Sequence, residues 1–220
     1  HAERLPISKR VQILKQNEFP EDYFDRIDTR PDIEFYQSPR LVAHIDDLTV
    51  QALTESYRQL LPESGVLLDL MSSWISHLPT DISYSHVSGL GMNQVELNAN
   101  SQLDHKTVQD LNQTPTLPYP DNTFHAVLKA VSIQYLTRPI EVFSEVARVL
   151  KPKGIFVVST SHRMFPTKAI RAWHILSSTE RIKLVTRYFE ISGGFSKVEF
   201  LDYSPPQPAD PLWLVVGTKG

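Results

Sequence analysis

The first residue whose setting suggests chemistry is an aspartate at the end of a short apolar run. The run begins at Val66, after a Pro-Glu-Ser-Gly break, and leads directly to Asp69. A strand this apolar is typical of a parallel sheet buried on both faces, and such sheets bind ligands at the carboxyl ends of their strands. Ser72 and Ser73 follow closely and supply hydroxyls, but 69–79 lacks the glycines of a nucleotide-binding turn. The stretch predicts a ligand-binding strand end with altered chemistry.

Two histidines and two basic residues are candidates for acid–base chemistry and for anion binding. His77 follows the first strand and His162 follows a later one, and imidazole titrates near neutral pH, so each is a candidate general base. Arg163 and Lys168 are candidates for holding an anionic substrate. The alternative is packing or backbone bonding for the histidines and ordinary surface charge for the cations. We take His77, His162 and Arg163 as the catalytic candidates.

A metal site is not expected. His44, Asp46 and Asp47 lie close in sequence, but adjacent positions do not share a helix face, so we expect capping or solvated roles. The chain has no cysteine, which excludes disulfides, thiolate ligands and a cysteine nucleophile. No G-x-S-x-G, H-E-x-x-H or P-loop pattern occurs, so hydrolase and nucleotide-triphosphatase readings have no support.

Charge and hydropathy narrow the range of partners. The net charge is −3 and the pI is about 6.3, which does not favour binding to nucleic acid or to anionic membranes. No apolar stretch approaches the roughly 20 residues of a membrane span, and no signal peptide is recognised, so we expect a cytoplasmic protein. We expect a small molecule as partner and leave the oligomeric state open.

Strands and helices alternate along the chain, and this order predicts a doubly wound α/β sheet. The last two strands are joined by a proline-rich turn with no room for a helix, so the final strand is expected to be antiparallel. Residues 1–61 are expected to form an extension, packed on the core by aromatic residues at 19, 23, 24, 35 and 36, and 62–220 the α/β domain. We expect strands at 66–69, 84–90, 106–109, 124–131, 155–160, 197–203 and 212–218, and helices at 39–61, 73–78, 94–101, 137–150, 166–176 and 179–189.

The segment 110–154 carries a family resemblance. It contains Leu-Pro-Tyr-Pro-Asp-Asn-Thr-Phe-His-Ala-Val and, further on, Glu-Val-Ala-Arg-Val-Leu-Lys-Pro-Lys-Gly. These resemble the L-P-[FY]-x-D-x-[ST]-F-D-x-[VI] and E-x-x-R-V-L-K-P-G-G motifs of class I S-adenosylmethionine-dependent methyltransferases, most of all the small-molecule branch called type 11. The stretches 69–79 and 89–93 are similar to a plant and bacterial methyltransferase-like subgroup without an assigned reaction. The resemblance implies a Rossmann-like methyltransferase sheet and S-adenosylmethionine as cofactor.

The resemblance also implies where the cofactor lies. The family's first strand ends in D-x-G-x-G-x-G; here Asp69 is kept, and Met71, Ser73 and Ile75 replace the glycines. The acid that binds the ribose at the end of the second strand is replaced by Gly91. An acid that accepts a hydrogen bond from the adenine amino group corresponds to Asp110. The residues implied in cofactor binding are Asp69, Met71, Ser72, Ser73, Gly91, Met92, Asn93, Asp110, Leu111, Val131 and Ser132.

Two questions about this site stay open at the level of sequence. Glu96 either replaces the missing ribose acid or closes a capping box with Asn93. Met71 and Trp74 either frame the cofactor or fill its place. The leading hypothesis is S-adenosylmethionine-dependent methyl transfer to a small molecule. The alternative is a non-catalytic binding or interaction protein of the same fold with a weakened or lost cofactor site. NAD binding is a weaker third reading, because it needs both the glycines and the ribose acid.

Overall fold

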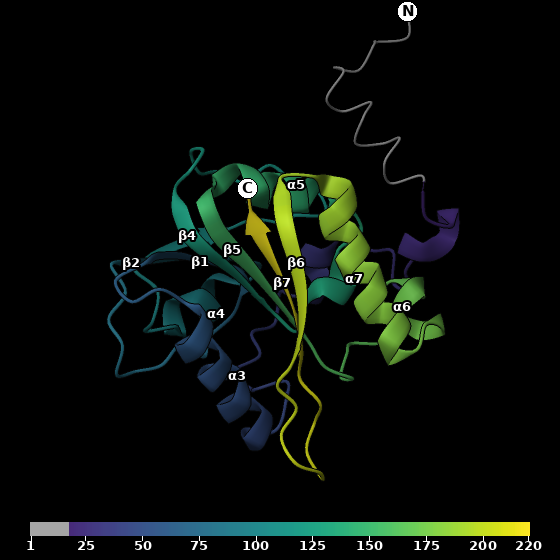
Figure 1. The fold of residues 1–220 in the computed structure, drawn as a ribbon. Coiled ribbons are helices and arrows are strands. Elements are labelled where there is room, and N and C mark those ends of the chain that lie inside the picture. Colours follow the sequence, from purple (N-terminus) through teal and green to yellow (C-terminus); the bar gives the residue numbers. More distant parts are fainter. Residues whose placement is uncertain (1–17) are drawn as a thin grey trace, which may run out of the picture.

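A computed structural model describes residues 18–220, and within them seven strands form one mixed sheet in the order β3-β2-β1-β4-β5-β7-β6 (Figure 1). The first five strands pair in parallel, and β7 runs antiparallel to both β5 and β6. This confirms the predicted doubly wound sheet and its reversed last strand. The strands are β1 Val66–Ser72, β2 His86–Gly91, β3 His105–Val108, β4 Phe124–Ala130, β5 Leu150–Thr160, β6 Phe195–Asp202 and β7 Trp213–Lys219.

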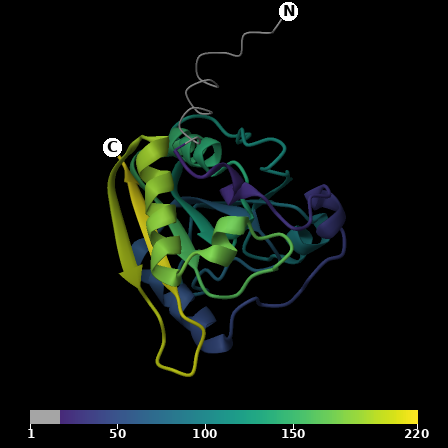
Figure 2. The same cartoon turned by 90° about the vertical axis from the view of Figure 1, so that its right-hand side faces the viewer.

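Helices cover both faces of the sheet, with α3 and α4 on one side and α5, α6 and α7 on the other (Figures 1 and 2). The central strands are buried on both faces, which produces their continuous apolar pattern. Neighbouring residues point to opposite faces: Leu67 packs with the α3 and α4 side, whereas Leu68 packs with the other. The helices are α2 Asp32–Phe35, α3 Asp47–Leu60, α4 Gln94–Ala99, α5 Pro139–Val149, α6 Arg171–Ile175 and α7 Ser178–Ser192, with 3-10 turns at Glu21–Phe24 and Ile133–Tyr135.

The connection after β1 differs from the prediction. The strand continues past Asp69 to Ser72, which pairs with Gly91 across an irregularity in the register. The predicted helix at 73–78 is wrong, because that loop bonds to side chains instead of to itself. Asn100 Nδ2 donates to the Ser73 carbonyl, and Gln102 bonds both the N–H and the C=O of Leu78. These bonds satisfy loop backbone groups without a helix.

The N-terminal extension is held to the domain by aromatic and charged contacts. The Phe19 and Phe24 rings lie 5.6 and 6.3 Å from that of Tyr188, and the Phe35 ring lies 5.5 Å from that of Phe165, as the aromatic pattern predicted. The helix predicted from 39 begins only at Asp47, where the Asp46 side chain accepts from the Thr49 N–H, so its expected capping role is confirmed. The part of the predicted extension at 1–17 lies outside the described residues.

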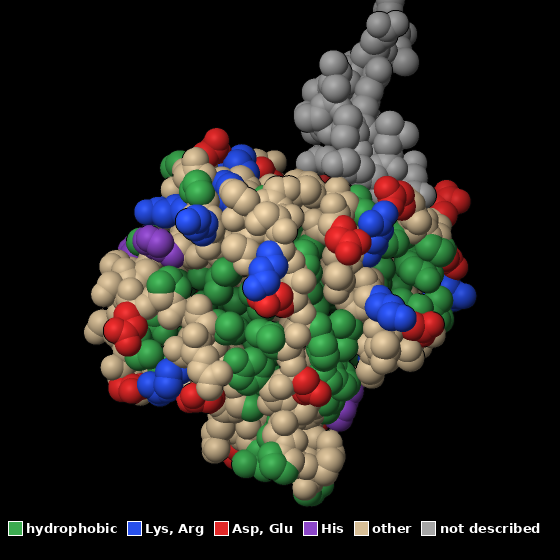
Figure 3. Space-filling view, viewed as in Figure 1, with side chains coloured by type: hydrophobic (Ala, Val, Ile, Leu, Met, Phe, Trp, Pro, Cys, Tyr) green, Lys and Arg blue, Asp and Glu red, His purple; other side chains and the backbone are tan. Residues whose placement is uncertain are grey.

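The surface gives no indication of a membrane-spanning element. Among the described residues, no helix has the length and hydrophobicity needed to cross a bilayer. On the face shown in Figure 3, Lys and Arg side chains are interspersed with Asp and Glu side chains. Mixed charges of this kind produce no strong single-sign field over that face.

Candidate functional site

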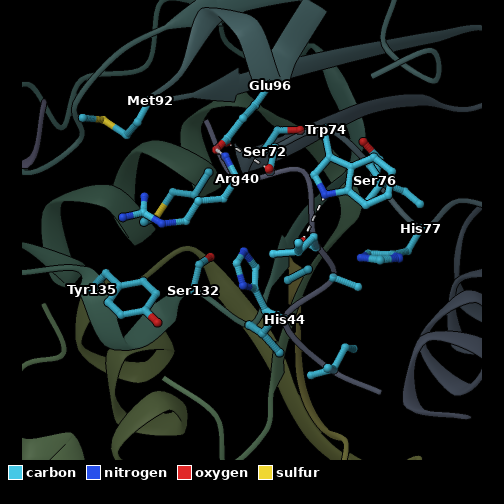
Figure 4. Close-up of a pocket in the computed structure, with 18 of the residues that line it drawn as sticks. Arg40, His44, Ser72, Trp74, Ser76, His77, Met92, Glu96, Ser132 and Tyr135 are labelled. Carbon is cyan, nitrogen blue, oxygen red and sulfur yellow. Dashed lines mark hydrogen bonds between the residues drawn. The ribbon is translucent and has the colours of Figure 1, made fainter. Parts of the chain in front are cut away.

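A cavity of about 330 Å³ opens at the carboxyl ends of β1 and β4 (Figure 4). Three parts of the chain form its wall: the N-terminal extension, the loops after β1 and β2, and the segments after β4 and β5. A cavity at this edge agrees with the general rule for ligand sites in α/β sheets. The lining residues are Tyr36, Arg40, 42–45, Asp69, 71–77, Met92, Glu96, 130–132, Tyr135 and 163–165.

The floor beside β1 is a buried acid and a buried lysine. Asp69 Oδ2 accepts hydrogen bonds from Ser72 Oγ and Ser76 Oγ, each at 2.6 Å. Burial raises the pKa of Asp69 to about 6, against the lowering effect of the two serines and of Lys129. Lys129 is fully buried, and this burial lowers its pKa, with Asp69 opposing. Its Nζ donates to Ser132 Oγ at 3.1 Å. Asp69 in β1 therefore organises the loop that follows the strand.

The replaced glycines and the missing ribose acid share one structural cause. Met71 adopts a φ of +57°, a conformation that favours glycine, and its sulfur contacts Lys129 Nζ. The extended β1 brings the Ser72 carbonyl against β2, so a Cβ on Gly91 would lie 2.3 Å from that oxygen. No side chain fits at Gly91, and an acid there is excluded sterically.

Glu96 takes a position that the sequence left open. Asn93 caps α4 as predicted, accepting from the N–H groups of Val95 and Glu96. The reciprocal capping box is not formed, because the Glu96 carboxylate accepts from Ser73 Oγ at 2.9 Å and from the Arg40 N–H at 2.7 Å. Glu96 thus lines the cavity beside Ser73, whereas Asn93 lines neither cavity and its amide holds the Tyr36 carbonyl.

A second cavity, of only about 20 Å³, lies toward β3. Asp110, Leu111, Gly91 and Met92 line it together with Tyr36 and Asp32 of the extension. Asn112 Nδ2 donates to Asp32 Oδ2 at 2.9 Å, and Lys168 Nζ lies 2.9 Å from Asp32 Oδ1, so the extension is fixed there. A volume of this size holds about one water molecule. Burial, with the Asp32 charge as a smaller cause, raises the pKa of Asp110.

The three predicted catalytic residues are not gathered at one place. His77 lines the cavity, and its Nδ1 is buried without a hydrogen-bond partner among the described residues. His162 does not line it, and its Nε2 lies 2.9 Å from Asp210 Oδ1. Arg163 lines the cavity, but its Nε pairs with Asp210 Oδ2 at 2.7 Å. Lys168 is fully buried against Asp32 and is unable to meet a substrate. Of the candidates His162, Arg163 and Lys168, only Arg163 thus lines the cavity.

The extension supplies cavity residues that sequence reasoning did not assign. Arg40 and His44 both line the cavity, and the His44 ring lies 5.2 Å from that of Phe165 (Figure 4). Partial burial lowers the pKa of His44, and burial together with His44 lowers that of His77 to about 4. In the sequence, the aromatic pair Phe35 and Tyr36 close to Arg40 was the one indication that this segment packs against the α/β domain. Val131 and Ser132 line the cavity after β4.

Comparison with known proteins agrees with this architecture. Residues 72–158 match the family described as a methyltransferase domain. The structure of an S-adenosylmethionine-dependent methyltransferase from Mesorhizobium loti aligns with 78% of this chain and 100% of its own, at 18% identity and a TM-score of 0.55. A methyltransferase from Thermotoga maritima, described as a possible histamine N-methyltransferase, aligns with 78% of this chain and 89% of its own, at 16% identity and a TM-score of 0.57. The [4+2]-cyclase SpnF aligns with 95% of this chain and 96% of its own, at 16% identity and a TM-score of 0.60.

One curated relative also matches over a short stretch. The biotin biosynthesis bifunctional protein BioHC of Teredinibacter turnerae is 36% identical over 50 residues, which are 23% of this chain and 9% of that protein. The chain thus spans a small part of that relative's length. The chain thus has the fold of S-adenosylmethionine-dependent methyltransferases, and its residues 72–158 match a methyltransferase domain.

The methyltransferase-domain match and the fold imply S-adenosylmethionine as the cofactor, and the two cavities differ in how well they fit its parts. The hydroxyl of Ser73 and the carboxylate of Glu96 line the open cavity and suit the polar amino-acid and ribose parts. The space beside Asp110 is too small for an adenine ring while Tyr36 and Asp32 lie there. The polar residues of the main cavity fit the amino-acid and ribose parts, and the structure has no space of adenine size beside Asp110.

Proposed function

We propose that this protein binds S-adenosylmethionine and transfers its methyl group to a small molecule held in the main cavity. The observation that carries the proposal is the composition of that cavity. It joins Asp69, Ser72 and Ser73 of the β1 end with Ser132 after β4, at the edge where the superfamily binds its cofactor. A volume of about 330 Å³ falls within the range typical of small-molecule sites.

Methyl transfer needs alignment above all, and the residues around Asp69 supply a rigid wall for it. When bound, S-adenosylmethionine supplies an electrophilic methyl group. Ser72 and Ser76 bond to Asp69 on one side, and Asn100 Nδ2 donates to Ser76 Oγ at 2.9 Å on the other. These bonds fix the loop that carries Ser73 and His77. Ser73 and Glu96 are the groups we assign to the cofactor's polar parts.

Two histidines are placed to accept a proton from a substrate. His77 and His44 line the same cavity, and each has a pKa lowered from its ordinary value. Both imidazoles are therefore neutral at pH 7 and hold a free lone pair. His44 replaces His162 in this role, because His162 lies outside the cavity. A substrate hydroxyl or amine between them would lose its proton as the methyl group is transferred.

The direct test is ligand binding by calorimetry and thermal shift with S-adenosylmethionine and S-adenosylhomocysteine. Ligand at 100 times its Kd should raise the free energy of unfolding by about 2.7 kcal/mol and the Tm by roughly 5–10 °C. Absence of saturable binding at millimolar ligand contradicts the proposal.

A second candidate is a binding protein of this fold that performs no methyl transfer. The cavity of about 20 Å³ beside Asp110 favours it, because the extension occupies the place of the adenine ring. Its signature is stabilisation of the protein by a small molecule without an adenosyl group, combined with no response to S-adenosylhomocysteine in the same thermal-shift experiment.

A further inference from the structure

The main cavity contains a cation that is not neutralised by any acid side chain of the described residues. Arg40 and Arg163 are the two basic residues of the lining with permanent charge. Arg163 is paired with buried Asp210. Arg40 uses Nη2 to donate to the Phe35 carbonyl at 3.2 Å, and its Nη1 is buried without a partner. An unsatisfied guanidinium nitrogen is costly in a folded protein, which points to a missing acceptor.

Aromatic rings fix the orientation of this guanidinium. Its central carbon lies 4.6 Å from the centre of the Phe35 ring and 5.2 Å from that of Phe165. Phe35 belongs to the extension and Phe165 to the segment after β5, so the group is held from two elements. Stacking of this kind leaves the in-plane N–H groups as the directions available for hydrogen bonds. The guanidinium is thus prepared to receive a planar anion before any ligand enters.

Neighbouring hydroxyls add donors on the same side of the cavity. Figure 4 shows Arg40, Ser132 and Tyr135 at one side, with His44 beside Ser132 and His77 farther across. The Tyr135 hydroxyl accepts from the Phe165 N–H at 2.8 Å and Ser132 Oγ accepts from Lys129 Nζ, so both hydroxyl protons are available to a ligand. Glu96, one of the two acids in the cavity lining, already bonds to Ser73 and to the Arg40 backbone.

We propose that Arg40, with Tyr135 and Ser132, forms an anion-binding subsite for the carboxylate or phosphate group of a small molecule. The inference deepens the proposed function and rests on it for the identity of the ligand. Arginine binds such groups through two parallel hydrogen bonds. The anion is either the amino-acid carboxylate of the cofactor or an acidic group of the methyl acceptor. Arg40 takes over the role that the sequence had given to Arg163 and Lys168.

The first test compares salicylate with salicylamide, which has nearly the same shape but no charge, by calorimetry on the full chain. The wild-type protein should bind salicylate about ten- to a hundredfold more tightly, as expected for charge-assisted hydrogen bonds. Arg40→Gln should reduce this preference to about one. Arg40→Lys keeps the positive charge but lacks the planar guanidinium. This variant should retain part of the preference for salicylate. Arg58→Gln, an exposed arginine on α3, is the matched control and should leave the preference unchanged.

Equal binding of the two probes by the wild-type protein overturns the subsite, as does a preference that survives Arg40→Gln in a folded variant. Two further ligands identify the source of the anion. If Arg40→Gln weakens S-adenosylhomocysteine but not 5′-methylthioadenosine, which lacks the amino acid, the anion is the cofactor carboxylate. If both bind the variant as they bind the wild type, the anion belongs to the acceptor. Failure of the wild type to bind S-adenosylhomocysteine contradicts the proposed function, while the salicylate comparison still decides the subsite.

Discussion

The two halves of the site differ although both lie along one edge of the same sheet. Beside β1 and β4, a cavity of about 330 Å³ is lined by polar groups that bond to one another and face open space. Beside β2 and β3, the extension leaves only about 20 Å³ around Asp110. Four residues line both cavities: Tyr36, Met71, Met92 and Tyr135. The fold alone therefore does not define a binding site, because an added segment closes one half of it.

The contrast between the two cavities shows that a change in one strand alters which residues fit in the neighbouring elements. The extension of β1 to Ser72 fills the space next to Gly91, and the carboxylate of Glu96 comes to lie against Ser73. We propose that Glu96, in the first turn of α4, takes the polar function that a second-strand acid would have. Substitutions in each half of the site test this account.

Restoring the family's acid with Gly91→Asp should damage the fold. The new Cβ would lie 2.3 Å from the Ser72 carbonyl oxygen, and both strands are in the buried centre of the sheet. We expect a loss of about 3–5 kcal/mol in the free energy of unfolding, measured by urea denaturation. Gly193→Ala is the control: its Cβ meets nothing within 4 Å, so only the glycine-type backbone conformation should cost stability, about 1–3 kcal/mol. Similar losses in the two variants would contradict the steric account.

Asp69 should make the stability depend on pH. Its pKa is raised from 3.8 to about 6 in the folded protein, so the folded state binds more protons than the unfolded state between these values. This contribution is present in full below pH 4 and is lost as the pH rises through 6, by about 3 kcal/mol at most. The difference in Tm between wild type and Asp69→Asn, followed from pH 4 to 7, measures it. Asn98→Ala, at an exposed position that does not titrate, should show a constant difference.

Removing the ring of Tyr36 should open the closed half. Tyr36 lines both cavities and its carbonyl is held by Asn93, so truncation clears space while the segment stays attached. Tyr36→Ala should strengthen S-adenosylhomocysteine binding by about tenfold, because less of the binding energy is used to displace the extension. Tyr36→Phe keeps the ring and serves as the control. Weaker binding by Tyr36→Ala would show that the ring holds the ligand instead of excluding it.

The smallest effect concerns the contact between the β1 loop and the extension. Trp74 Nε1 donates to the Val42 carbonyl at 3.1 Å (Figure 4). Trp74→Phe removes this bond and should cost about 1 kcal/mol of stability, seen in urea denaturation. Native-state hydrogen exchange should then show faster exchange in 40–45 while the strands keep their protection. Unchanged exchange there would mean that other contacts fix the segment.

Much of the scaffold was predictable because burial leaves a periodic trace in the sequence. The apolar runs around Leu68 and Val127 predicted the central strands, and Pro139 with the following stripe predicted α5. The proline-rich turn before β7 predicted the antiparallel end of the sheet. The helix after β1 failed, because Asn100 and Gln102 satisfy that loop from a distant part of the chain.

The sequence by itself determined the succession of strands along the chain, the class of fold and the acid within β1. Each of these depends on local patterns of burial and turn residues. Only the tertiary structure decided which charges are free. Asp210 neutralises Arg163, Asp32 holds Lys168, and Arg40 has no acid partner within residues 18–220. Side-chain pairing of this kind joins residues far apart in the chain, because it depends on which surfaces meet after folding, and no local periodicity records it.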